Sequence, residues 1–473
     1  MSEQTDKFDI VVIGAGFSGT MVAVNLLKLA KMPLNVCLIE RDSHQFGRGI
    51  AHSSELDSHL LNVPAANMSA FPDQPDHFLA WAQTRANDTL KPNQVNEVDL
   101  KAFLPRRHYG DYLNWTLDQA VACADPQVKL RCVLDKAIDL ALQADGQVKI
   151  RMAGGESFLA HRVVLALGNF PPGNPPIADP GFYGSQRYFR NPWLPGVLQE
   201  VLNTRSCLLI GSGLTMVDWA VSLDQAGYQG TIHVVSRRGL WPLSHRLASP
   251  VAFEIDVDRG KLGALSWARQ IRRYLRETGG DWRSVIDALR PATQGLWKRL
   301  SISQQRRFLR HLRAFWDLHR HRLAPPVAAK LDALIEQQKL LRHVGNVVAY
   351  RESEQQVEVA IRLRRSDAIK TLTVEAVVNC SGTESNYRRL ESTFVRNLLR
   401  SGLICPDPLG LGLMVAENGA LIDANGETSR RLFTLGPPKK GMLWETTAVP
   451  ELRGQAQQLA KLLLEDLSAT AIS

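Results

Sequence analysis

The sequence predicts an α/β fold that contains two strand–turn–helix–strand units and a helical insertion. Three observations support this prediction. A continuous apolar run begins near residue 9 and another near residue 207, and a glycine pattern follows each run directly. Each pattern leads into a stretch with helical periodicity, and residues 255–345 lack the alternation of strands. The chain has 473 residues, of which 45% are hydrophobic and 22% charged, as is typical of a folded protein of two or three domains.

The first unit begins with a β-branched strand, Asp9–Ile13, that is apolar enough for a buried parallel strand. The pattern Gly14-x-Gly16-x-x-Gly19 follows directly, and helical periodicity then runs over 20–30. A second apolar strand, 36–39, ends in an acidic residue, Glu40.

Each of these positions has a physical role. Gly14 permits a tight turn, Gly16 leaves room for a pyrophosphate at the helix N-terminus, and Gly19 lets helix and strand approach closely. Glu40 can accept hydrogen bonds from the ribose hydroxyls of an adenosine. We interpret this unit as dinucleotide-binding; the alternative is an ordinary βαβ unit with a glycine turn.

The second unit repeats the arrangement with different ends. Strand 207–210 leads into Gly211-x-Gly213-x-x-Met216 and a helix, and strand 232–235 ends in Ser236-Arg237-Arg238. Guanidinium groups pair bidentately with phosphate, so these residues favour the 2′-phosphate of NADPH rather than NADH. The alternative is a solvated strand end.

Two units with unlike ends predict two different nucleotides, FAD in the first and NADPH in the second. The sequence therefore predicts an α/β protein with two Rossmann-like dinucleotide-binding domains and a helical insertion. Strands that end at Gly168 and Gly382 would carry the chain out of the first domain and back into it. The expected boundaries are 1–170 plus 380–473 for the FAD domain, 171–254 plus 346–379 for the NAD(P) domain, and 255–345 for the insertion.

Positive charge is concentrated in the insertion. Residues 255–345 contain 19 Lys or Arg and 8 Asp or Glu, while the whole chain has a net charge of +9. We interpret the segment as amphipathic helices with solvated arginines and Trp267, Trp282, Trp297 and Trp316 in a small core. The alternatives are a surface for a partner or nucleic acid, and a lid that receives an acidic substrate. The acidic substrate ranks above nucleic acid because no nucleic-acid motif is present.

In the C-terminal part, the sequence pattern predicts a strand that ends at Gly436 and a helix that begins at about Pro450. Such a helix N-terminus would suit an anionic reduced flavin. The six cysteines form no CxxC pair, the N-terminus lacks a signal-peptide pattern, and no apolar run reaches the ~18 residues of a membrane span. We expect a cytoplasmic protein without a metal site.

Several segments together resemble one family, the bacterial FAD/NAD(P)-binding flavoproteins, which are related to flavin-containing and N-hydroxylating monooxygenases. The segments are Gly14–Gly19, Phe46–His52, His59–Ala65, Met68–Pro72, Phe103–Gly110, Gly211–Met216, Ser236–Leu240 and Trp444–Glu451. The pattern between the two domains departs from that of Baeyer–Villiger enzymes, since Tyr188 stands where a histidine belongs and Trp193 comes one position late.

The resemblance implies an FAD-dependent, NADPH-using oxidoreductase, monooxygenase-like, that acts with O₂ on a small acidic or amine substrate. The alternatives are an NADPH–flavin reductase with another acceptor and a flavin-bound module that binds a partner. Catalytic residues remain unassigned, and lone histidines such as His52 and His245 are interpreted as packed or surface residues. Asn62 and Met68 would lie near the flavin by resemblance.

The candidate cofactor-binding residues come from the two glycine turns, the strand ends and the C-terminal segment. They are Gly14, Gly16, Phe17, Ser18, Gly19, Glu40, Arg41, Gly49, Asn62, Met68, Gly168, Gly211, Gly213, Leu214, Thr215, Ser236, Arg237, Arg238, Gly382, Gly436, Trp444, Glu445 and Thr446.

Overall fold

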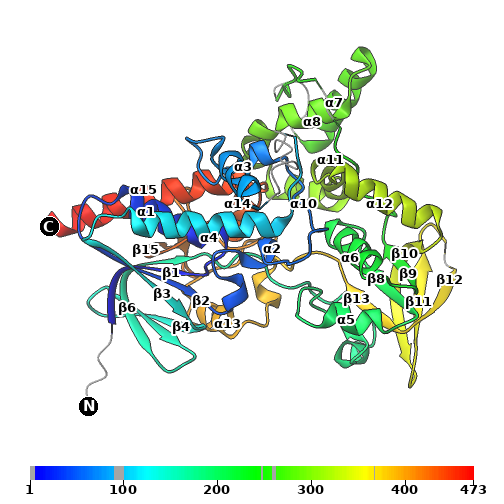
Figure 1. Cartoon of the computed structure of the whole chain (residues 1–473), viewed down its shortest axis with the longest axis horizontal. Helices are drawn as coiled ribbons and strands as arrows, with labels where there is room; N and C mark the ends of the chain where they lie inside the picture. The colour runs from blue at the N-terminus through cyan, green and yellow to red at the C-terminus, as the bar shows by residue number, and fades with distance from the viewer. Residues whose placement is uncertain (1–5, 90–100, 247–248, 258–262, 367, 473) are drawn as a thin grey trace. The chain divides into compact units, whose positions relative to one another are not determined.

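The computed structural model describes residues 6–89, 101–246, 249–257, 263–366 and 368–472. The chain divides into two compact units (Figure 1). The first unit comprises Met1–Asp57, Val63–Asn169 and Ser385–Ser473, and the second comprises Ser58–Asn62 and Phe170–Glu384. A short segment before Val63 therefore belongs to the second unit although its neighbours in sequence belong to the first.

The first unit is built on a mixed sheet whose main path has the order β14-β15-β6-β1-β2-β3. β1 pairs in parallel with β2 on one side and with β6 on the other. β14 pairs antiparallel with β15, and β4 pairs antiparallel with β5. The strands are β1 (Asp6–Ile13), β2 (Leu34–Glu40), β3 (Val128–Leu134), β4 (Ala137–Leu142), β5 (Val148–Met152), β6 (Ser157–Leu165), β14 (Ala420–Ile422) and β15 (Thr428–Thr434).

Three long helices, α1, α4 and α15, lie over this sheet, and α1 contacts both of the others (Figure 1). α1 starts at Phe17, three residues before the predicted start, because Gly16 already has the extended backbone of a helix N-cap. The helices are α1 (Phe17–Leu29), α2 (Gly49–His52), α3 (His77–Thr89), α4 (Arg106–Ala122), α13 (Thr393–Arg400), α14 (Lys440–Leu443) and α15 (Val449–Ile472), with 3₁₀ turns η1 (Ser43–Gln45), η2 (Ala65–Asn67), η5 (Tyr387–Arg389) and η6 (Pro437–Lys439).

The second unit has a seven-stranded sheet with the order β12-β11-β10-β9-β8-β13-β7. The parallel part of this sheet comprises β7, β13, β8, β9 and the first part of β10. The second part of β10 pairs antiparallel with β11. The strands are β7 (Tyr188–Phe189), β8 (Ser206–Ile210), β9 (Thr231–Ser236), β10 (Leu340–Glu352), β11 (Val357–Leu363), β12 (Ile369–Val374) and β13 (Ala376–Asn379).

Helices fill the stretch between β9 and β10, as the sequence predicts. The helices of the second unit are α5 (Val197–Leu202), α6 (Leu214–Gln225), α7 (Ala264–Thr278), α8 (Trp282–Leu289), α9 (Thr293–Arg299), α10 (Ile302–His311), α11 (Arg313–Arg320) and α12 (Pro325–Glu336), with η3 (Gly181–Gly184) and η4 (Arg290–Ala292). β10 begins at Leu340, so the helical stretch ends a few residues before the predicted boundary at 345.

Two separate cores support these helices. Leu331 and Leu334 of α12 are buried in the same cluster as Met216 and Trp219 of α6, so α12 packs with the sheet helices. Phe253, Val285 and Leu289 form a small cluster against α7. Among the four tryptophans expected in a small core, Trp267 and Trp297 are buried, and Trp282 and Trp316 are half-buried.

Candidate functional site

The first glycine turn connects β1 to α1 and has the geometry that its pattern requires. Gly14 has φ +103°, and a Cβ there would overlap the carbonyl oxygen of Ala166 at the end of β6. A Cβ on Gly19 would overlap the carbonyl oxygen of Gly14. Both positions therefore exclude side chains because strand and helix approach too closely.

The N-terminus of α1 adjoins a second glycine-containing segment. Gly49, at the start of α2, has φ +60°, and a Cβ on Gly16 would lie 3.3 Å from the Gly49 Cα. Phe17, Ser18 and Gly19 form the first turn of α1, whose backbone N–H groups lack partners within the helix. This backbone-lined helix end fits an anionic group such as a pyrophosphate.

Glu40 reaches back toward the same turn from the end of β2. Its side chain is buried; Oε2 accepts a hydrogen bond from the Ala15 N–H at 2.9 Å, and Oε1 accepts one from the Arg41 N–H at 2.9 Å. Each carboxylate oxygen retains a further lone pair that can accept a ribose hydroxyl. Arg41 itself is exposed.

A wall of packed aromatic side chains lies beside α1, and no pattern in the sequence predicts it. Tyr109 of α4 is fully buried against Phe17, Phe78 and His52. Within the described part of the chain, the Tyr109 hydroxyl and the His52 Nδ1 are buried without a hydrogen-bond partner.

Burial keeps both groups of this wall uncharged at neutral pH. Burial raises the pKa of Tyr109 well above its ordinary value. Burial, with Arg106 nearby, lowers the pKa of His52 to about 3. The structure thus agrees with the interpretation of His52 as a packed residue rather than a free general base.

The C-terminal segment meets the first turn of α1. A Cβ on Gly436 would lie 3.1 Å from the Ser18 Oγ. Thr446 Oγ1 donates to the Gly436 carbonyl oxygen at 3.2 Å, and Gln455 of α15 binds both the Gly436 N–H and Thr446. Gly436, Ser18 and Thr446 are thus brought together.

Trp444 lies in a strained turn within this segment. It has φ +62° and ψ −65°, and the Glu445 N–H donates to the Leu443 carbonyl oxygen at 2.7 Å, which makes a γ-turn of the rare kind. Both Trp444 and Glu445 are buried. Backbone strain of this kind persists where the surrounding structure fixes it.

Asn62 and Met68 belong to different units. Met68 is buried at the end of η2 in the first unit. Asn62 lies in the segment that joins the second unit, where its carbonyl oxygen accepts a hydrogen bond from His245 Nε2 at 2.9 Å. His59 of the same segment bonds Ser222 of α6 at 2.7 Å.

The second glycine turn, between β8 and α6, follows the first closely. Gly211 has φ +108°, and a Cβ there would lie 2.5 Å from the Cys380 carbonyl oxygen. Gly213 precedes α6, whose first turn contains Leu214 and Thr215, and Met216 in place of the third glycine is fully buried in the core. Gly168 (φ +61°) and Gly382 (φ +95°) follow β6 and β13, and a Cβ on either would meet nothing within 4 Å.

The turn after β9 contains the predicted phosphate-binding residues. Ser236 Oγ accepts a hydrogen bond from the Gly239 N–H at 3.1 Å, which closes the turn. Arg237 is exposed, whereas Arg238 donates to the Arg310 carbonyl oxygen at 2.7 Å. Arg342 and Arg364 also reach this turn, from 103 and 126 residues away, and no pattern in the sequence predicts their approach.

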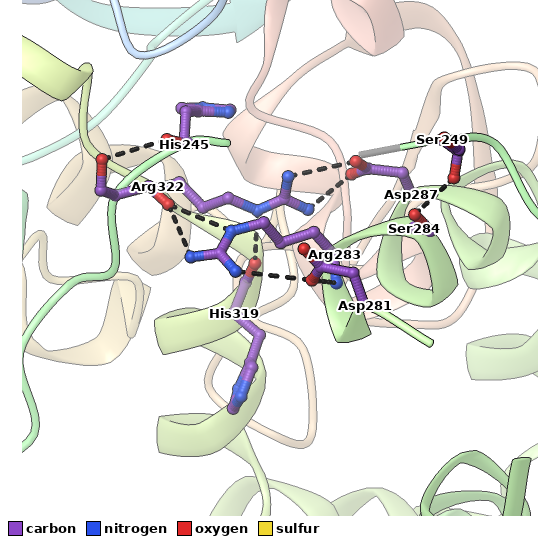
Figure 2. Close-up of polar contacts among 9 residues, drawn as sticks. His245, Ser249, Asp281, Arg283, Ser284, Asp287, His319 and Arg322 are labelled. Carbon is purple, nitrogen blue, oxygen red and sulfur yellow. Dashed lines mark hydrogen bonds and ion pairs between the residues drawn. The ribbon is translucent and has the colours of Figure 1, made fainter. Parts of the chain in front are cut away.

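A polar network holds the insertion to the loop that follows β9 (Figure 2). The buried Arg322 donates two hydrogen bonds to the Asp287 carboxylate, from Nη2 to Oδ1 at 2.6 Å and from Nη1 to Oδ2 at 3.1 Å. Its Nε donates to the His319 carbonyl oxygen. Arg283 donates to the Ser244 carbonyl oxygen through Nε and Nη2. In the described ranges, the structure contains no group of three His, Cys, Asp or Glu side chains arranged to hold a metal ion.

Comparison with known proteins supports the interpretation of the first unit. Residues 11–170 match the family described as FAD-NAD(P)-binding, which confirms the predicted dinucleotide-binding class of this region. The chain is 27% identical over 171 residues to the FAD-dependent monooxygenase azaH of Aspergillus niger, a match that covers 34% of this chain and 38% of azaH. The chain therefore spans well under half of this curated relative.

Solved structures match almost the whole chain. Ornithine hydroxylase (PvdA) from Pseudomonas aeruginosa superposes with a TM-score of 0.65 at 14% identity, over 98% of this chain and 100% of that one. Ornithine N-hydroxylase KtzI from Kutzneria sp. 744, solved with reduced FAD, NADP⁺ and L-ornithine, superposes with a TM-score of 0.62 at 14% identity, over 97% of this chain and 99% of that one.

These likenesses confirm the predicted fold class, an α/β protein with two Rossmann-like domains, and the resemblance to two-domain flavoproteins. No helix in the described ranges is long and apolar enough to cross a membrane.

Proposed function

We propose that this chain, whose residues 11–170 match the FAD-NAD(P)-binding family, is an FAD-dependent, NADPH-using oxidoreductase of the monooxygenase-like class. The observation that carries the proposal is the pair of glycine turns. One is followed by a buried carboxylate, Glu40, and the other by the exposed Arg237. Such unlike ends suit two unlike nucleotides.

The first nucleotide site would use the residues around α1. Gly14, Gly16 and Gly19 would admit the FAD pyrophosphate, with Phe17 and Ser18 in the turn that binds it, and Glu40 would bind the ribose. The remainder of the site would be lined by further residues of the first unit, Arg41, Gly49, Met68, Gly168, Gly436, Trp444, Glu445 and Thr446. We assign this site to a domain of residues 1–170 plus 380–473.

The second site would bind NADPH at the end of β8 and β9. Gly211, Gly213, Leu214 and Thr215 would admit the pyrophosphate at the N-terminus of α6, and Ser236 would lie beside the adenosine. We assign it to residues 171–254 plus 346–379, with the helical insertion at 255–345.

When bound, FAD would take electrons from NADPH and use them to activate O₂ toward a small substrate. The residues of this chain would bind and orient the cofactors. The buried Tyr109 and the half-buried His52 would exclude water from the wall beside α1 without adding charge there.

The substrate is proposed to be small and either acidic or an amine. The insertion presents a row of exposed positive charges, because four arginines follow helical spacing along α7: Arg269, Arg272, Arg273 and Arg276. Such a row could attract an acidic substrate or a protein partner. The six cysteines are free thiols. Free thiols are typical of a reducing compartment, so we propose a cytoplasmic location.

The test is to record the visible spectrum of the purified protein, to add NADPH without oxygen, and then to admit oxygen. Flavin absorbance that NADPH bleaches and oxygen restores, with NADPH use coupled to an added amine or acid, would support the monooxygenase-like function. Bleaching followed by reoxidation only with a dye would favour a reductase. A colourless protein that cannot be reconstituted with FAD would contradict the proposal.

A further inference from the structure

The turn after β9 contains more cationic groups than the sequence of the turn reveals. We infer that Arg237, Arg342 and Arg364 form an arginine collar that selects a nucleotide with a 2′-phosphate, and that Arg238 instead fastens the insertion. This inference rests on the proposed use of NADPH.

Arg238 is engaged with the insertion. Its Nη2 donates to the Arg310 carbonyl oxygen at 2.7 Å, in the last turn of α10, and its guanidinium lies 5.6 Å from the ring centre of Phe315 in α11. A cation at a helix C-terminus is favourable because it meets the negative end of the helix dipole. Arg238 is thus a positioning residue that connects the turn to α10 and α11.

Arg342 and Arg364 converge on the same turn from neighbouring strands. Arg342 lies on β10, which pairs with β9 in parallel, and its Nη1 donates to the Gly239 carbonyl oxygen at 3.3 Å. Arg364 follows β11, and its Nη1 donates to the Arg238 carbonyl oxygen at 3.3 Å. The main chain of Arg364 is fixed by a hydrogen bond from its N–H to the Val344 carbonyl oxygen at 3.0 Å. Both guanidinium groups are therefore held at the two residues that follow Arg237, Arg364 at Arg238 and Arg342 at Gly239.

In the part of the chain that the structure describes, these three cations have no acidic partner. Among the described residues, no Asp or Glu forms an ion pair with Arg237, Arg342 or Arg364, and all three side chains are exposed. Like charges held close together repel each other, and an anion placed among them relieves this repulsion.

The chemistry of the collar favours phosphate. Each guanidinium has five N–H donors, and the bonds above use one donor of Arg342 and one of Arg364. The remaining donors can form the paired contacts that phosphate oxygens accept. A 2′-hydroxyl carries no charge, so the collar discriminates NADP⁺ from NAD⁺ rather than strengthening the binding of both.

The test measures binding by calorimetry with four probes, NADP⁺, NAD⁺, 2′,5′-ADP and 5′-AMP. Arg342→Ala and Arg364→Ala are each expected to weaken NADP⁺ and 2′,5′-ADP roughly tenfold while NAD⁺ and 5′-AMP bind as before. Arg237→Ala is expected to weaken the same two probes, and Arg238→Ala to affect them less. Arg351→Ala is the matched control, because Arg351 lies on the same strand as Arg342 and is paired with Glu358.

The outcomes separate the two proposals. If the wild-type protein binds NADP⁺ no better than NAD⁺, the proposed use of NADPH fails. If the wild type prefers NADP⁺ and both Arg342→Ala and Arg364→Ala keep the full preference, the collar is overturned while NADPH use stands. If an alanine variant does not fold, Arg342→Gln and Arg364→Gln replace it, and retained preference in those variants overturns the collar equally.

Discussion

Glu40 is held at the first glycine turn by two backbone contacts. Its two carboxylate oxygens each accept a backbone N–H, one from Ala15 in the turn and one from Arg41. A carboxylate with both oxygens occupied in this way has a fixed orientation. Its remaining lone pairs therefore face a defined position, which is what recognition of a ribose requires.

Replacing Glu40 with glutamine tests this role. The Glu40→Gln amide keeps one acceptor oxygen but turns an NH₂ group toward the second N–H, so a buried donor loses its partner. We expect FAD to bind about tenfold more weakly, measured by flavin fluorescence titration of the apoprotein. Asp42→Asn is the control, because the Asp42 carboxylate accepts hydrogen bonds from η1, from the His44 N–H at 3.0 Å and from Gln45 Nε2 at 2.7 Å. Equal FAD affinity in Glu40→Gln and the wild type would contradict the assignment.

His52 gives the folded state a pH dependence whose sign is fixed. Burial lowers the pKa of His52 from 6.5 to about 3, so between these values the unfolded chain binds a proton that the folded chain does not. The contribution of His52 to the free energy of unfolding is therefore largest above pH 6.5. This contribution decreases as the pH falls from 6.5 toward 3.

His52→Gln removes the titrating group and tests that dependence. We expect the wild type to lose roughly 1–2 kcal/mol more stability than the variant between pH 7 and pH 5, measured by urea unfolding. Other histidines with lowered pKa, such as His343, titrate in both proteins and cancel. His161→Gln, at an exposed histidine, should follow the wild type. Parallel losses in His52→Gln and the wild type would show that His52 is solvated in the folded state.

At the scale of elements, the clamp between α8 and the end of α11 holds the insertion together. Arg322 is 4% exposed and forks onto Asp287, whose side chain is 59% exposed. Trp282 lies under both Arg283 and Arg322, with ring distances of 4.3 and 5.4 Å. The arginines therefore connect the helices through charge and through contact with an aromatic ring.

Asp287→Asn should loosen this clamp. The change leaves the buried Arg322 guanidinium without its carboxylate, and we expect a loss of about 1–2 kcal/mol, smaller than for a fully buried pair because Asp287 is solvated on one side. Hydrogen exchange of α8 and α11 is the measurement. Asp317→Asn is the control, since it breaks an exposed pair with Arg313 and should change stability by less than about 0.5 kcal/mol. Unchanged exchange in Asp287→Asn would show that the clamp carries no stability.

At the scale of the whole molecule, the features that could be predicted from the sequence are those formed by residues close together in the chain. Each strand, its glycine turn and its helix lie within about thirty residues, so the two units and the α/β class could be predicted and are confirmed. Arg342 and Arg364 could not be associated with Ser236 from the sequence, because the parallel pairing of β10 with β9 and the antiparallel pairing of β11 with β10 bring them near. The hydrogen bond from His245 to Asn62 spans 183 residues and likewise depends on the fold.

The division into two units predicts separate responses to the two proposed cofactors. A ligand present at about one hundred times its Kd stabilises the part that binds it by about 2.7 kcal/mol, which raises the Tm of a unit of this size by roughly 5–10 °C. We expect calorimetry of the apoprotein to show two transitions, with FAD raising one and NADP⁺ raising the other. Arg237→Ala should reduce the response to NADP⁺ and leave the response to FAD unchanged, because Arg237 lies in the second unit and Glu40 in the first. A single transition that both ligands raise equally would show that the two units unfold as one cooperative body.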